Sequence, residues 1–170
     1  DALRLFHLFG PGVLSGAGGV THNPTGAAVQ LSLSGVNTYT GATTVDFPQV
    51  FTPNTPASGT LAIVGGSGRI ASTAINIRNS GAVTIGEAAV VYSGGNAQGR
   101  VNDAAALNFG GGYLNFGATS PTVSNNEQMG ALSLDTSHSV ITLFTASAVQ
   151  SNGTFSSLTR GSDRGTLFIR

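Results

Sequence analysis

Short runs of alternating apolar and polar residues constrain this chain most, because they occur in pairs that recur along the sequence. Each pair is divided by a linker rich in glycine, asparagine or serine, and in the C-terminal half equivalent pairs return about every 25 residues, a spacing typical of solenoids. A period of two places Leu, Ile and Phe on one face of a strand and Asn, Ser and Thr on the other. The pairs are 75–77 with 83–85, 107–109 with 113–116, 132–134 with 140–143, and 155–158 with 166–169.

This pattern predicts an all-β fold with parallel strands stacked coil upon coil. Most linkers are longer than the two residues of a tight hairpin, so consecutive strands are not expected to pair with each other. One coil cannot bury its apolar face alone, whereas several stacked coils form a continuous core. We expect that core to contain Ile75, Ile77, Val83, Ile85, Leu107, Phe109, Leu114, Phe116, Leu132, Leu134, Ile141, Leu143, Leu167 and Ile169.

The segment 31–45 reads LSLSGVNTYTGATTV, which is a strand, a polar turn and the start of a second strand. It resembles the autotransporter-associated β-strand repeat, whose usual form is close to LxLSGxNTYTGxTTVxxGTLxL. The elements LSG, NTYTG and TTV stand here in that family's order and spacing. Later segments are similar to other coils of the family, and the resemblance covers roughly residues 13–170. These segments are 14–21 (LSGAGGVT), 100–107 (RVNDAAAL), 127–134 (EQMGALSL), and 157–160 (SLTR) with 165–167 (GTL).

The resemblance implies a right-handed parallel β-helix with coils of about 25 residues. It also implies a structural, passenger-type segment of a bacterial protein that is secreted or exposed at the cell surface. We therefore interpret residues 1–170 as a single β-helix domain that is a segment of a longer solenoid.

A proline-rich stretch over residues 46–58 departs from the family pattern, which runs directly from TTV to GTL. It contains three prolines, and proline cannot lie in a central strand, so we expect a loop insertion. The insertion is either a tolerated excursion or a contact loop. The second alternative would use the apolar side chains of Phe47, Val50 and Phe51, which are costly to expose.

Composition excludes several classes of function. Charged residues make up 8% of the chain and the formal net charge is zero, so the basic surface of a nucleic-acid-binding protein is absent. The chain has no cysteine, which excludes disulfides and cysteine-ligated metals. No apolar run approaches the 18 or so residues of a membrane-spanning helix, and we expect no membrane insertion by this segment.

Four acids are candidates for polysaccharide chemistry, since some parallel β-helices cleave polysaccharides with carboxylate pairs. Glu87, Asp103, Glu127 and Asp135 are single, far apart in sequence and mostly in apparent turns, so we interpret them as solvated turn residues. His7, His22 and His138 lack metal-ligand spacing and are expected at the surface or in turns. We therefore expect no catalytic residues, no metal and no cofactor.

Asparagines recur beside the expected core positions. Stacked asparagines can form hydrogen-bonded ladders along a solenoid; inward-facing ones would be structural, whereas outward-facing ones only solvate the sheet. Asn108 and Asn115 alternate with Leu and Phe, which places them on the outer face.

Both ends of the chain are apolar, which suggests that this domain associates with copies of itself, end to end as a filament, or with adjacent coils of the same polypeptide. Open coils present unpaired backbone groups, and a head-to-tail contact propagates instead of closing. Two alternatives remain: an adhesin that binds a glycan or host surface, and a polysaccharide-active enzyme. The candidate interface residues are Leu3, Leu5, Phe6, Leu8, Phe9, Phe47, Val50, Phe51, Leu167, Phe168 and Ile169.

Overall fold

The computed structural model describes residues 12–24, 29–47, 59–86, 99–117, 125–144 and 151–170. Within these ranges the regular structure consists of β-strands, and no helix long and apolar enough to cross a membrane occurs. The strands are β1 (Val20–His22), β2 (Val29–Leu33), β3 (Val36–Asn37), β4 (Thr43–Asp46), β5 (Gly59–Ile63), β6 (Arg69–Ile70), β7 (Ala74–Arg78), β8 (Ala82–Gly86), β9 (Ala106–Gly110), β10 (Gly112–Gly117), β11 (Asn125–Leu134), β12 (His138–Leu143), β13 (Ser151–Arg160) and β14 (Thr166–Ile169).

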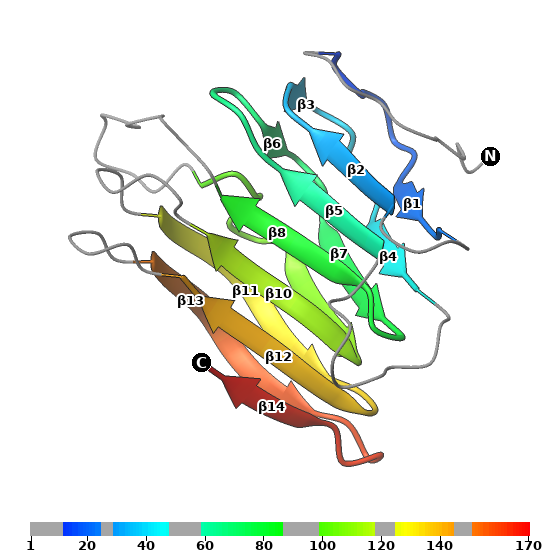
Figure 1. Cartoon of the computed structure of the whole chain (residues 1–170), viewed down its shortest axis with the longest axis vertical. Helices are drawn as coiled ribbons and strands as arrows, with labels where there is room; N and C mark the ends of the chain where they lie inside the picture. The colour runs from blue at the N-terminus through cyan, green and yellow to red at the C-terminus, as the bar shows by residue number, and fades with distance from the viewer. Residues whose placement is uncertain (1–11, 25–28, 48–58, 87–98, 118–124, 145–150) are drawn as a thin grey trace.

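The strands form a parallel β-solenoid with two large sheets (Figure 1). Sheet A has the order β1-β4-β7-β9-β11-β13, sheet B has the order β2-β5-β8-β10-β12-β14, and a small third sheet joins β3 to β6. Every strand pairing is parallel. The chain alternates between sheets A and B, so each strand pairs with the strand one coil earlier. The predicted parallel β-helix is confirmed.

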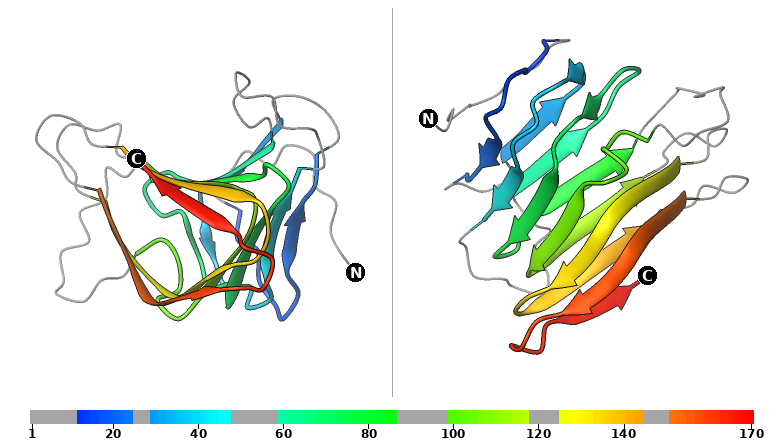
Figure 2. Two further views of the ribbon diagram at one scale, coloured as in Figure 1. Left: turned by 90° about the horizontal axis from the view of Figure 1, so that it is seen from below. Right: turned by 180° about the vertical axis from the view of Figure 1, so that it is seen from behind.

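The winding of the coils is right-handed, as expected for parallel strands joined by crossovers. In Figure 1 the chain runs from right to left along sheet B at the front, returns along sheet A behind it, and descends from the N-terminus to the C-terminus. The view from behind shows the same course (Figure 2, right).

Coil length differs between the two halves. Asn76 bonds to Thr44 and Asn108 bonds to Asn76, and each of these contacts spans 32 residues. In the C-terminal half Asn152 contacts Asn126 across 26 residues, and the final coil contacts its neighbour across 28. The predicted repeat of about 25 residues therefore applies to the C-terminal half, whereas the spacing of the earlier coils is uneven, from 22 residues between Leu61 and Val83 to 32 between Thr43 and Ile75.

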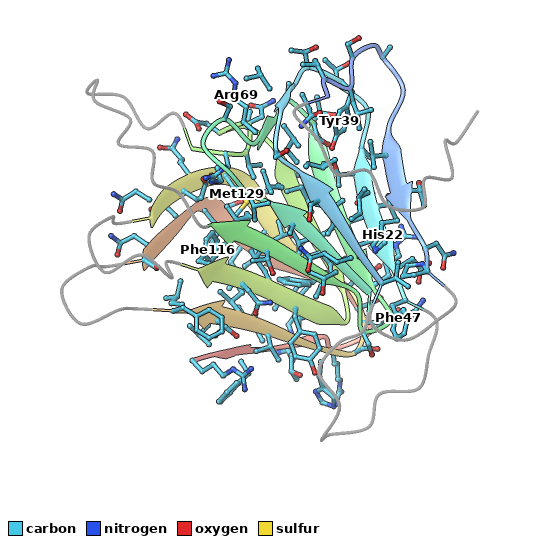
Figure 3. All side chains as sticks on the ribbon, turned by 45° about the horizontal axis from the view of Figure 1, so that its top comes forward. His22, Tyr39, Phe47, Arg69, Phe116 and Met129 are labelled. Carbon is cyan, nitrogen blue, oxygen red and sulfur yellow. The ribbon has the colours of Figure 1, made fainter. Side chains whose placement is uncertain are left out.

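One continuous core lies between the sheets, as the alternation predicts (Figure 3 shows Phe116 and Met129 within it). Leu107, Phe109, Leu114 and Phe116 are fully buried, and Leu143 and Leu167 are partly buried against the core. The prediction is wrong for Ile169, which lies in the last strand of sheet B and is 59% exposed.

Three residues of the NTYTG segment, Asn37, Tyr39 and Gly41, each have a structural role. Asn37 is buried: its side-chain oxygen Oδ1 accepts the N–H of Leu14, and its side-chain Nδ2 donates to the backbone carbonyls of Gly35 and Arg69. Tyr39 lies in the core and shares a hydrogen bond with Thr43 at 2.6 Å. A side chain at Gly41 would lie 2.5 Å from the backbone of Gly18, so only glycine fits.

Candidate functional site

The candidate acids do not share one environment. Asp103 and Asp135 are exposed in turns, as expected, and Glu87 lies outside the described residues. Glu127 contradicts the expectation of a solvated turn residue, because it lies within β11 and is 3% exposed. The sequence interpretation failed here because it did not expect a strand at residue 127, whose alternation with Met129 turns the carboxylate inward.

Glu127 binds the backbone of the preceding coil with both carboxylate oxygens. Oε1 accepts the N–H of Arg100, and Oε2 accepts the N–H of Val101 at 3.3 Å. Burial raises the pKa of Glu127 to about 7. The two backbone hydrogen bonds and the positive charge of Arg100 lower this pKa by less than burial raises it, and Asp103 adds a further increase.

Arg100 extends the same contact to the coil before its own. Its guanidinium is buried and donates from Nη1 to the carbonyl of Gly68 at 2.6 Å and from Nη2 to that of Gly65 at 2.7 Å. Its own carbonyl accepts the N–H of Ile70. Gly65–Gly68, Arg100–Val101 and Glu127 thus join three successive coils at one corner, which we call the Arg100–Glu127 corner.

The local sequence explains why this corner can form. A side chain at Gly99 would overlap the carboxylate of Glu127, so glycine leaves room for it. Val101 pairs with Ile70 and continues the third sheet by one bridge. Within the described residues no further strand follows Val101 in that sheet, and the Glu127 carboxylate accepts the N–H groups that face the next coil.

One of the three histidines is buried, although all were expected at the surface or in turns. His138 is exposed, and its Nδ1 hydrogen-bonds with the hydroxyl of Thr166. His22 is buried, which contradicts the expected surface position, and its Nε2 lies 3.3 Å from the carbonyl oxygen of Val29. Burial lowers the pKa of His22. His7 lies outside the described residues.

Most of the expected interface residues lie outside the described residues. Phe47 is described and is buried, so its ring is not presented to a partner. The ring lies beside Gly59, which also approaches Pro24, at the edge of the coil (Figure 3). The undescribed members are Leu3, Leu5, Phe6, Leu8, Phe9, Val50 and Phe51, and the undescribed part of the insertion is 48–58.

The expected interface at the C-terminal coil is exposed. Phe168 and Ile169 are 61% and 59% exposed, and Leu167 is partly buried. Seen along the solenoid from this end, β13 and β14 frame the last coil (Figure 2, left). Behind them lies an apolar depression of about 330 Å³, which we call the C-terminal mouth. Its lining is Phe116, Leu132, Ile141, Leu143, Gly153, Phe155, Ser157, Leu158, Leu167 and Ile169.

The outer face of sheet A carries an asparagine ladder, although asparagines on the outer face were expected only to solvate the sheet. Asn108 donates to Asn76 at 2.8 Å, and Asn76 donates to Thr44 at 3.1 Å, so three coils are linked by side chains. Asn152 repeats the contact with Asn126 at 2.7 Å in the last coils. These amides bond to one another along the stack.

No group of three or more metal-ligating side chains occurs among the described residues. Comparisons with protein families, with curated proteins and with solved structures found no match for this chain.

Proposed function

We propose that this chain is a structural β-solenoid: a passenger-type segment of a bacterial protein that is secreted or exposed at the cell surface, and that stacks end to end through its terminal coils. The observation that carries the proposal is the C-terminal mouth. There Leu158 and Ile169 are exposed, although their register partners Leu132 and Ile141 are buried by the next coil.

The architecture supports a scaffold. Parallel coils add strands without changing the cross-section, and the core, the backbone ladders and the asparagine ladder all run along the stack. Within the described residues no strand pairs with the outer edges of β13 and β14, and free edges with apolar side chains template further strands. A second copy of this chain, or further coils of the same polypeptide, would cover them.

The extracellular part of the proposal is supported by the resemblance of residues 13–170 to the autotransporter-associated repeat. Labelling intact cells of the source organism with an antibody against this domain tests it directly. Surface labelling that protease treatment of intact cells removes is expected, and labelling that requires lysis would contradict this part.

Sedimentation and electron microscopy of the isolated chain test the end-to-end stacking. We expect the mass to increase with concentration and short filaments to form. One negative charge at the mouth, introduced by Leu158→Asp, should abolish the association. Ser156→Asp places the same charge on an exposed position of β13 and should leave it intact. A monodisperse monomer at high concentration would contradict the stacking.

Glycan binding is a second candidate, which one surface feature favours. Tyr113, Val140 and Phe168 stand in register on neighbouring strands and form an apolar row on the outer face of sheet B. Arg170 donates to the hydroxyl of Thr142 at 3.2 Å, and its charge also acts on Tyr113. Aromatic side chains beside hydrogen-bonding groups are typical of binding surfaces, because the ring offers an apolar contact and the neighbouring group a polar one. Screening against a glycan array tests this alternative, with Phe168→Ala and Tyr113→Ala expected to remove any signal.

We propose no enzymatic role. Glu127 uses both oxygens for backbone N–H groups, and Asp103 and Asp135 are in solvated turns. An assay on a panel of polysaccharides should show no turnover. Turnover that is lost in Glu127→Gln or Asp103→Asn would support the enzyme alternative instead.

A further inference from the structure

The outer face of sheet B changes in chemistry along the solenoid. One register row crosses all of its strands and consists of Gln30, Thr60, Ala82, Tyr113, Val140 and Phe168. The first three members are small or polar, and the last three, on β10, β12 and β14, form the apolar row. These three strands are neighbours at the C-terminal end of the sheet (Figure 1). Phe168 is exposed, so the apolar row is open to solvent at that end.

A row of hydrogen-bonding side chains lies beside the apolar row, two residues further along the same strands, which is about 7 Å. Asn115 and Thr142 are register partners in this polar row. Arg170 is its next member, because the backbone of Arg170 bonds to Ile141 and Leu143. An amide, a hydroxyl and a guanidinium therefore stand in line beside the aromatic side chains.

Arg170 supplies a positive charge on a sheet without acids. None of the strands of sheet B contains Asp or Glu. The Nε of Arg170 donates to the hydroxyl of Thr142 at 3.2 Å, which positions the guanidinium on this face. Burial raises the pKa of Tyr113 and the charge of Arg170 opposes that rise, so the guanidinium lies near the phenol. A cation positioned in this way is complementary to an anionic ligand.

The spacing of the two aromatic side chains fits an extended sugar chain. Tyr113 and Phe168 are two strands apart, which is about 9.5 Å along the row. This is close to the length of two sugar units in an extended polysaccharide. The C–H face of a sugar ring packs on an aromatic side chain, and the polar edge of the ring would then meet Asn115 and Arg170. A guanidinium binds a carboxylate through two parallel N–H bonds, so a carboxylate is the substituent that this edge favours.

We propose that the C-terminal half of the outer face of sheet B binds a polyuronate, a polysaccharide whose sugar units carry carboxylates. The sugar rings lie along the apolar row and one carboxylate pairs with Arg170. The inference rests on the glycan-binding candidate and names its ligand class, and it is independent of end-to-end stacking.

Isothermal titration calorimetry with a short oligomer of hexuronic acid tests the proposal. Its matched control is the same oligomer after reduction of the carboxyl groups to neutral alcohols, which should bind about tenfold more weakly because one charged hydrogen-bonded contact is lost. A Gly-Ser tail after Arg170 keeps the terminal carboxylate away from the guanidinium. Arg170→Gln should bind both oligomers equally. Arg78→Gln makes the same change at an exposed position of sheet A and should keep the preference.

The location of binding is tested by the amide chemical shifts of the chain with the oligomer added. The largest changes are expected at Tyr113, Val140 and Phe168, and changes confined to other strands would overturn the proposal. Equal binding of the acidic and the reduced oligomer would overturn the carboxylate preference and leave the glycan-binding candidate intact. Equal binding of polyglutamate would overturn recognition of a sugar in favour of charge alone. No binding of either oligomer would contradict this inference, and an empty glycan array would contradict the glycan-binding candidate as well.

Discussion

The middle coils and the last coil of this solenoid follow the same sequence pattern, yet they differ in what the pattern buries. Leu132 and Leu158 are register partners in sheet A, and they are 3% and 62% exposed. Ile141 and Ile169 are the corresponding partners in sheet B, with exposed fractions of 3% and 59%. In each pair the residue type and the neighbour on one side are alike. The two residues of each pair differ in whether another coil covers them on the other side.

The comparison shows that burial in a solenoid belongs to the stack and not to the strand. An inward-facing residue contacts side chains of its own coil, of the coil before it and of the coil that follows. Substitutions should therefore have effects that depend on coil position more than on residue type.

The largest expected effect is at a residue covered on both sides. Leu107→Ala should lower the free energy of unfolding by about 2–5 kcal/mol, because it removes a fully buried side chain and leaves a cavity. Urea denaturation measures the change. A cost below about 1 kcal/mol would mean that the middle coils are packed no better than the last one.

A second prediction uses the close approach of coils at Gly41. Gly41→Ala should cost about 1–3 kcal/mol, because the added methyl group would overlap the backbone of Gly18 and Gly19 and force the first coils apart. Gly117→Ala is the matched control, since a side chain there meets no atom within 4 Å. Thermal unfolding of the two variants should separate them clearly, and equal melting temperatures would contradict the close approach.

The asparagine ladder should contribute less to the free energy of unfolding than the packing at Leu107 and Gly41. Asn76→Ala should cost about 0.5–1.5 kcal/mol, because it removes the bonds to Thr44 and to Asn108 on a half-buried face. A double-mutant cycle with Thr44→Ala isolates the bond between those two side chains. A coupling energy of zero would show that the ladder accompanies the stack without stabilising it.

The sequence predicted the fold better than it predicted the environment of polar side chains. Alternation with a period of two located the strands and most of the core, because a period of two is fixed by the backbone itself. The pattern gave no sign that His22 and Glu127 face inward. Their burial depends on partners supplied by other segments: the carbonyl of Val29 for His22 and the N–H groups of Arg100 and Val101 for Glu127.

Ile169 shows a different limit of sequence reasoning. Its alternation with Phe168 correctly places it on the inward face, in register with Ile141. The expectation of burial failed because inward orientation and burial are separate properties, and only a neighbouring coil converts one into the other.

The smallest expected effect is therefore at Ile169. In dilute solution Ile169→Ala should change the free energy of unfolding by less than about 0.5 kcal/mol, as for most surface substitutions. Ile141→Ala, at the register partner of Ile169, should cost about 2–5 kcal/mol.

Repeating the Ile169 measurement at high protein concentration sharpens the comparison. If copies stack through the C-terminal mouth, the Ile169 side chain becomes buried there. The free-energy cost of Ile169→Ala should then rise toward that of Ile141→Ala, because association stabilises the folded state. A cost that stays small at every concentration would show that no coil covers Ile169 in the isolated chain.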